Sequence, residues 1–342
     1  MTDKVKGREC WIDVAKGIGI ILVVLGHVTR NDNLIRIIYS FHMPLFFFLS
    51  GWIINRNCGK NIINKQYIKK KFANLILPFF EYRIILVLYW YIIEYRFREL
   101  DVGPIWFLPV MFFSYMIIAF VMPYIKSTNA KRVVFLFFAL LAIAGLLVRQ
   151  YVYKLNMELL NEVYVNSIRV LTGCFWMTVG MKANDSIINS KKVNCGLVFG
   201  ITAIVCVVLS FVNGDVSLFN LQFGKSYVLY FLEGICGITA VLIVSKVISS
   251  NRLIEYLGRS SMVIMAFHEP IKRVLFVVYD AVVPKFVGGG GTHEVIRTTV
   301  TGSVILTTIT LVVCISVVYI FRKLIEKLPD NKWREVLFAF MK

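Results

Sequence analysis

The chain has 342 residues, of which 58% are hydrophobic and only 17% are charged. Its mean hydropathy of +0.72 is too high for an ordinary soluble domain. A formal net charge of +18 would indicate nucleic-acid binding in a soluble protein, but here the basic residues follow a membrane topology. The composition therefore predicts a multi-pass membrane protein with no nucleic-acid partner.

Ten apolar segments of roughly 20 residues can each form a membrane-spanning helix. They lie near residues 11–28, 37–54, 72–93, 105–125, 133–150, 165–181, 195–212, 226–245, 260–283 and 299–320. Lys and Arg are concentrated in alternate connections, and this bias marks the cytoplasmic side. We expect an all-α transmembrane bundle in the cell membrane, of the bacterial cytoplasmic type, with both termini cytoplasmic. Residues 1–342 are predicted to form one integral-membrane domain without a signal peptide or an appended soluble domain.

The first two expected spans contain four ionisable side chains in or beside apolar runs. Lys16 and His27 are separated by roughly 20° around a helix and roughly 16 Å along it, so they share one face at two depths. Asp13 precedes Lys16 by three residues and can pair with it. A short polar connection at 29–33 lets His42 re-enter the membrane near the depth of His27. Two imidazoles at similar depth indicate a functional site, although packing histidines and interfacial anchoring remain structural alternatives.

The connection at 55–71 is the longest basic segment, and it ends in Lys69, Lys70 and Lys71. These lysines are explained most simply as cytoplasmic anchors that contact anionic membrane lipid. The alternative is that they bind a phosphorylated ligand from the cytoplasm.

Four further candidates occur later in the chain. Trp106 opens the fourth span, where aromatic residues lie at the membrane interface. Arg169 is a cation in the sixth span and is expected to pair with a carboxylate. Glu233 is expected to act as a proton carrier or to pair with Arg169 or a histidine. His268 begins the polar segment 268–273, whose charges and proline predict a broken helix that lines a polar cavity.

The remaining polar features are interpreted as structural. The seven cysteines form no CxxC pair, and no metal-ligand spacing occurs, so neither a disulfide nor a metal site is expected. His293 follows the glycine-rich segment 288–291 and is expected to be solvated.

Several of these segments, in this order, resemble the acyltransferase-3 family of integral-membrane O-acyltransferases, close to its fucose 4-O-acetylase-like branch. The first is the cation, ten residues and histidine of Lys16 and His27, followed by FHMPLFFFLSG from residue 41. The others are a basic segment before the third-span proline, a WFL segment at Trp106, and LGRSSMVIMAFHEP from residue 257.

The resemblance implies transfer of an acyl group, usually acetyl, from cytoplasmic acetyl-CoA to a hydroxyl of a cell-surface or lipid-linked glycan. It implies that His27 is the general base and that Lys16 is the family's first-span cation. The family often has two arginines three residues apart before the third-span proline; here these positions are Lys71 and Asn74, so the second charge is lost. With Lys16, Asp13 and Lys70, they form the predicted CoA-binding set.

Roles for the other candidates follow from this hypothesis. His42 orients His27 or contacts the acceptor, and Glu233 is a third catalytic candidate. Arg169, Trp106 and His268 are expected to contact the substrate. A proton-coupled transporter or flippase remains the alternative because embedded ionisable residues also suit a proton relay, although no internal repeat is found. A structural partner of a glycan-assembly complex is a third reading, and homo-oligomerisation is left open.

Overall fold

The computed structural model describes residues 9–57, 64–93, 103–121, 128–154, 157–183, 195–249, 251–287 and 292–327. These residues form helices and their connections, apart from a small antiparallel hairpin of β1 (Val216–Ser217) and β2 (Gln222–Phe223). The chain divides into two compact units, each assembled from segments far apart in the sequence.

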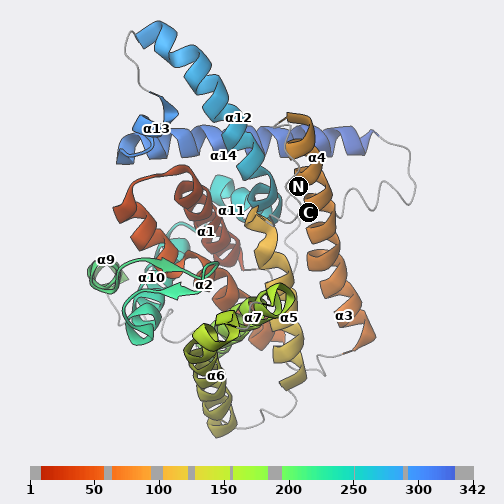
Figure 1. Cartoon of the computed structure of the whole chain (residues 1–342), viewed down its shortest axis with the longest axis vertical. Helices are drawn as coiled ribbons and strands as arrows, with labels where there is room; N and C mark the ends of the chain where they lie inside the picture. The colour runs from red at the N-terminus through yellow and green to blue at the C-terminus, as the bar shows by residue number, and fades with distance from the viewer. Residues whose placement is uncertain are drawn as a thin grey trace. The chain divides into compact units, whose positions relative to one another are not determined.

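The first unit comprises residues 1–38, 82–105 and 239–342. Its helices are α1 (Cys10–Val28), the start of α2 (Asp32–Asn57), most of α4 (Leu77–Ile93), the end of α10 (Tyr227–Val247), α11 (Arg252–Arg259), α12 (Ser261–Val287), α13 (His293–Ile296) and α14 (Val300–Glu326). Helix α1 packs against α11, α12 and α14, which are labelled in Figure 1. Ser303 Oγ lies 2.9 Å from Thr29 Oγ1, which places the start of α14 beside the end of α1.

Two glycines allow α1 and α11 to touch backbone to backbone. A Cβ added to Gly258 would overlap the carbonyl oxygen of Asp13, and one added to Gly17 would overlap that of Ile254. Helix α11 begins at an N-cap, where the side chain of Asn251 accepts hydrogen bonds from two backbone amides. The first half of α1 is therefore fixed against α11 by direct main-chain contact.

The second unit comprises residues 39–81 and 106–238. It contains the rest of α2, α3 (Lys65–Lys71), the π-helical turn η1 (Phe72–Ile76), the end of the 3₁₀ turn η2 (Gly103–Trp106), α5 (Phe107–Val121), α6 (Thr128–Lys154), α7 (Glu158–Lys182), α9 (Cys195–Asn213), the hairpin and the start of α10. Helix α7 packs against α5 and α6. It also meets α2 closely, because a Cβ on Gly51 would overlap the carbonyl oxygen of Met177 and one on Gly180 that of Phe48.

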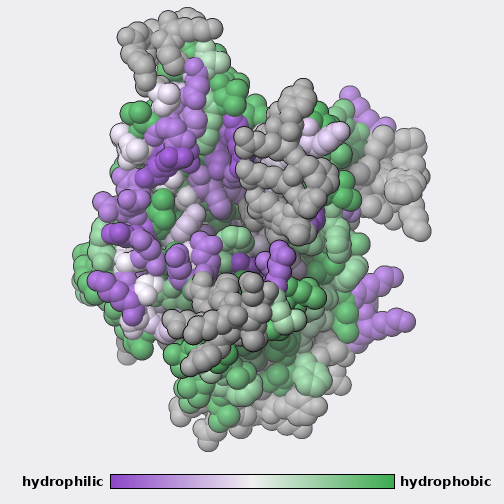
Figure 2. Space-filling model, in the orientation of Figure 1, coloured by the Kyte–Doolittle hydropathy of each residue, from purple (hydrophilic) through white to green (hydrophobic). Residues whose placement is uncertain are grey.

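The described helices have the length and composition of membrane spans. Among the described residues, six segments are long and apolar enough to cross a bilayer: Cys10–Val28, Asp32–Asn55, Lys65–Ile92, Cys195–Asn213, Tyr227–Val247 and Val300–Glu326. Figure 2 shows wide hydrophobic areas on the surface of the face that it presents. The predicted all-α membrane protein is thus confirmed, whereas ten spans, cytoplasmic termini and a single domain stay predictions.

One prediction about the ninth span is wrong. Helix α12 continues through Pro270 without interruption, and the break lies earlier, at Ser260 between α11 and α12. A proline is tolerated inside a membrane helix when the surrounding protein satisfies the freed carbonyl. The polar segment 268–273 is therefore presented on a regular helical surface.

Candidate functional site

Helices α1 and α12 bring two histidines from distant parts of the sequence together in the first unit. The ring centroids of His27 and His268 are 5.0 Å apart, with the planes inclined by 49°. The carboxylate of Glu269 completes the cluster, since one side-chain ligand atom from each of the three residues lies within 4.8 Å of the others. His27 is half-buried and His268 is fully buried. Two potential bases and a carboxylate therefore share one small polar site.

The hydrogen bond of His268 defines which of its nitrogens can act. Its Nδ1 lies 3.1 Å from the backbone carbonyl oxygen of Ile264. A carbonyl only accepts, so Nδ1 carries the hydrogen and Nε2 of the neutral ring is an acceptor. Within the described part of the chain, Nε2 has no hydrogen-bond partner. An unpaired buried acceptor is costly, and this nitrogen is free to accept a hydrogen bond from an incoming hydroxyl.

Glu269 is held by two cations on its own helix. Lys272 Nζ lies 2.7 Å from one carboxylate oxygen, and Arg273 Nε lies 3.1 Å from the other. His27, His268 and Glu269 are also residue types that bind divalent metals. However, both carboxylate oxygens are already engaged, and the two cations would repel a metal ion. The cluster fits proton transfer and hydrogen bonding better than metal binding.

Asp13 and Lys16, near the start of α1, have a different arrangement from the predicted one. Lys16 and His27 do lie on one continuous helix. The predicted pair of Asp13 with Lys16 is wrong, because α11 places Arg259 Nε 3.4 Å from Asp13 Oδ2. Lys16 is half-buried and makes no hydrogen bond or ion pair with the residues that the structure describes. It therefore remains available on α1 as the predicted donor-binding cation.

His42 and Glu233 belong to the second unit. The ring of His42 lies 5.0 Å from that of Tyr39. Glu233 is fully buried, and its Oε1 accepts a hydrogen bond of 3.0 Å from Asn213 Nδ2. Among the alternatives for Glu233, pairing with Arg169 is not found in the described chain. Roles of His42 and Glu233 beside His27 stay predictions.

Arg169 contacts both Trp106 and the connection between the two strands of the β-hairpin. The guanidinium of Arg169 donates from Nε to the carbonyl of Phe219 at 3.1 Å and from an η nitrogen to Asn166 Oδ1 at 3.0 Å. It also lies 5.2 Å from the ring of Trp106 and 4.6 Å from that of Phe219. These contacts hold the connection between β1 and β2, and contact with substrate stays a prediction.

The predicted phosphate-binding residues lie around η1 in the second unit. The Nζ of Lys71 lies 3.2 Å from the ring centroid of Tyr115, whereas Lys70 and Asn74 are exposed. Asn74 lies within the π-helical turn itself, a feature often found at functional sites. Lys70 is thus the more accessible cation of the predicted set.

His293 was expected to be solvated, and this is wrong. Its Nδ1 lies 2.6 Å from Asp280 Oδ2, and its ring stacks on Phe276 at 4.5 Å. Packing of α13 against α12 brings these groups together across the segment 288–291, which lies outside the described residues.

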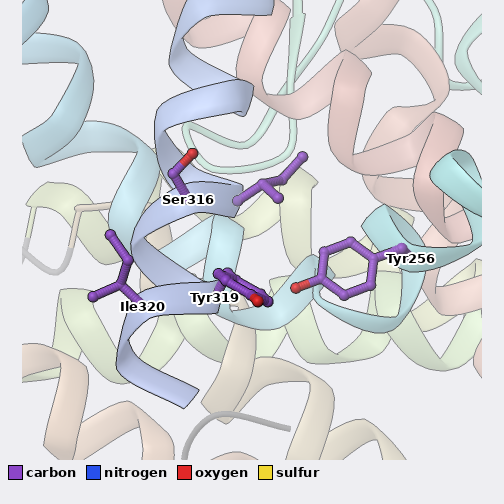
Figure 3. Close-up of a pocket in the computed structure, with 5 residues that line it drawn as sticks. Tyr256, Ser316, Tyr319 and Ile320 are labelled. Atoms are coloured by element: carbon purple, nitrogen blue, oxygen red, sulfur yellow. The ribbon is translucent and has the colours of Figure 1, made fainter. Parts of the chain in front are cut away.

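A cavity of about 480 Å³ lies elsewhere in the first unit. It is lined by Tyr256 of α11 and by Ile315, Ser316, Tyr319 and Ile320 of α14. Figure 3 shows the hydroxyls of Tyr256 and Tyr319 directed toward one another, with Ser316 as the third polar side chain of the lining. The lining contains no histidine or carboxylate, and Ser316 is roughly 20 Å along α14 from Ser303, which contacts Thr29 at the end of α1. This cavity therefore lacks the base that the His27 cluster contains.

Comparison with known proteins gives one match. The acyltransferase-3 family model, described as an acyltransferase domain, matches residues 10–320. No curated protein and no solved structure shows significant similarity to the chain. The matched range includes both helices that form the His27 cluster.

Proposed function

The chain belongs to the acyltransferase-3 family, and from this premise we propose that it transfers acetyl from cytoplasmic acetyl-CoA to a hydroxyl of a cell-surface or lipid-linked glycan. It is a membrane acyltransferase; the donor, the acceptor and the catalytic base are the proposal. The observation that carries it is the proximity of His27, His268 and Glu269 in one unit. Acyl transfer to a hydroxyl requires a base beside the attacking oxygen, and direct transfer requires no nucleophile from the protein.

In this mechanism the neutral imidazole of His27 accepts the hydroxyl proton as the oxygen attacks the thioester carbonyl. The C–O bond forms, the C–S bond breaks, and the proton passes from the imidazolium to the departing CoA sulfur. Glu269 stabilises the imidazolium while it exists, and its salt bridges with Lys272 and Arg273 keep the carboxylate oriented. Nε2 of His268 accepts a hydrogen bond from a second hydroxyl of the same sugar, which orients the acceptor.

On the donor side, Lys16 binds CoA, and the pantetheine arm extends along α1 over the roughly 16 Å to His27. Lys70 and Lys71 suit the CoA phosphates as point charges. Because Lys71 lies against Tyr115, Lys70 is the cation with the freer access to a cytoplasmic ligand. His42 and Glu233 are retained as candidates for acceptor binding and proton movement.

The decisive experiment uses purified protein in nanodiscs supplied with radiolabelled acetyl-CoA and a panel of candidate glycans. We expect free CoA to appear faster when an acceptor is present, with label recovered in the glycan as an ester. The matched control contains the same nanodiscs without acceptor. Failure to bind or turn over acetyl-CoA and longer acyl-CoAs under every acceptor condition, together with glycan flux driven by a pH gradient, would favour the transporter instead.

His268→Phe tests the proposed acceptor contact, because phenylalanine fills the same buried space without an acceptor nitrogen. We expect the KM for the glycan to rise about tenfold, as for one lost hydrogen bond, while the KM for acetyl-CoA stays the same. Steady-state kinetics with each substrate varied in turn measures both constants. A fall in kcat with an unchanged glycan KM would instead assign His268 to the chemical step.

A further inference from the structure

The last backbone carbonyls of α1 accept hydrogen bonds from side chains outside this helix. The last carbonyls of an α-helix have no partner within the helix, and in a membrane protein water does not supply one cheaply. Lys272 Nζ of α12 donates to the carbonyl oxygen of His27 at 3.2 Å. Arg297 Nε, just before α14, donates to the carbonyl oxygen of Val28. Two successive carbonyls, one of them belonging to His27 itself, are thus capped by cations.

Both cations are buried and each has a carboxylate partner. Lys272 and Arg297 are 8% and 9% exposed. Lys272 pairs with Glu269 at 2.7 Å, and Arg297 pairs with Glu294 at 3.4 Å. Burial lowers the pKa of the Arg297 guanidinium and Glu294 acts in the opposite direction, but its ordinary value is so high that the group stays charged. The two positive charges therefore lie at the negative end of the α1 dipole, where they stabilise the helix.

The segment that carries Arg297 is itself attached to the chain leaving α1. The backbone amide of Arg30 donates to the carbonyl of Arg297 at 2.9 Å, and the side-chain amide of Asn31 donates to the carbonyl of Thr298 at 2.9 Å. The Oγ of Ser303 donates to the Arg297 carbonyl at 2.8 Å. Arg297 therefore approaches Val28 from a fixed position.

We propose that Lys272 and Arg297 form a carbonyl clamp, a pair of positioning residues that hold the last turn of α1 so that the His27 imidazole faces His268 and Glu269. The catalytic consequence of the clamp depends on the proposed role of His27, whereas its effect on the helix end does not. Displacing a reacting group by about 1 Å can lower a rate by about a hundredfold. A loosened last turn would move His27 without removing any group that touches the substrates.

The kinetic test compares Arg297→Met and Lys272→Met with the conservative variants Arg297→Lys and Lys272→Arg. Lys272→Met also removes the salt bridge to Glu269, so Arg297→Met is the variant that tests the clamp without disturbing the His27 cluster. We expect kcat for acetyl transfer to fall about 10- to 100-fold in the methionine variants, with the KM for acetyl-CoA within about twofold of wild type. The conservative variants should recover most of the loss. The matched control is Lys323→Gln, which removes a cation paired with Glu326 at the exposed end of α14 and should leave kcat unchanged.

A second measurement does not depend on activity. Hydrogen exchange followed by mass spectrometry should show faster exchange of the amides in the last turn of α1 in Arg297→Met, with exchange in α14 unchanged. If the last turn of α1 exchanged in Arg297→Met at the same rate as in the wild type, the proposal would be overturned. Faster exchange in this variant with an unchanged kcat would also overturn it. So would a loss of kcat that Arg297→Lys does not recover. If the wild type uses no acyl-CoA at all, the proposed function fails, and the exchange experiment alone decides whether the clamp exists.

Discussion

Replacing His27 by glutamine is expected to lower kcat for acetyl transfer about a thousandfold, in the middle of the range for loss of a general base. Glutamine keeps the approximate size and a polar end but cannot carry the proton between the acceptor oxygen and the CoA sulfur. Binding of acetyl-CoA, measured by equilibrium dialysis with the nanodisc-embedded protein, should stay within about twofold of wild type because the side chain acts only in the transition state.

The matched control is His293→Gln, in the same unit. His293 bonds to Asp280 and stacks on Phe276, and it has no place in the proposed mechanism. The kcat of the His293→Gln variant is expected to remain within about threefold of wild type, as for a substitution outside the reacting groups. Equal losses in both variants, or a His27→Gln enzyme with near wild-type turnover, would remove His27 from the role of base.

Gly258→Ala is expected to destabilise the protein by about 3 kcal/mol or more, at the upper end for overpacking. The added methyl group would overlap the main-chain oxygen of Asp13, and a main chain cannot move aside as the end of a flexible side chain can. Relief requires α11 to separate from α1, which would also break the contact between Arg259 and Asp13. Thermal unfolding of the detergent-solubilised protein, followed by size-exclusion chromatography of heated samples, measures the loss.

Gly200→Ala is the matched control for this substitution. Gly200 also lies within a helix, α9, but a Cβ there would meet nothing within 4 Å. Because alanine is the better helix former, this variant should gain about 0.5–1 kcal/mol. If Gly258→Ala and Gly200→Ala unfolded at the same temperature, backbone contact between α1 and α11 would not be the reason for glycine at position 258.

Features set by local sequence could be predicted well. The segments expected to span the membrane fall largely on helices because length and apolar composition act within each segment. The common face of Lys16 and His27 followed from the periodicity of one helix, and both residues do lie on α1. The hairpin at Val216–Phe223 was missed because two strands of two residues leave no clear alternation in the sequence.

The candidate site could be predicted only in part because it depends on contacts between distant segments. His27 and His268 were both singled out, but nothing local indicated that their rings would lie together. Glu269 had no role of its own in the sequence interpretation, although its place beside His268 was an available signal. Arg297 was not singled out from the sequence, since its contact with Val28 exists only when α14 lies beside α1.

The backbone contact at Gly17 also determines how α1 can move. Sliding a helix by one residue requires a shift of about 1.5 Å and a turn of about 100°. The carbonyl oxygen of Ile254, directly over Gly17, leaves no room for the side chain that such a shift would bring there. While α1 and α11 stay in contact, neither helix can therefore slide along the other by one residue. A change of register between these two helices would require them to separate first.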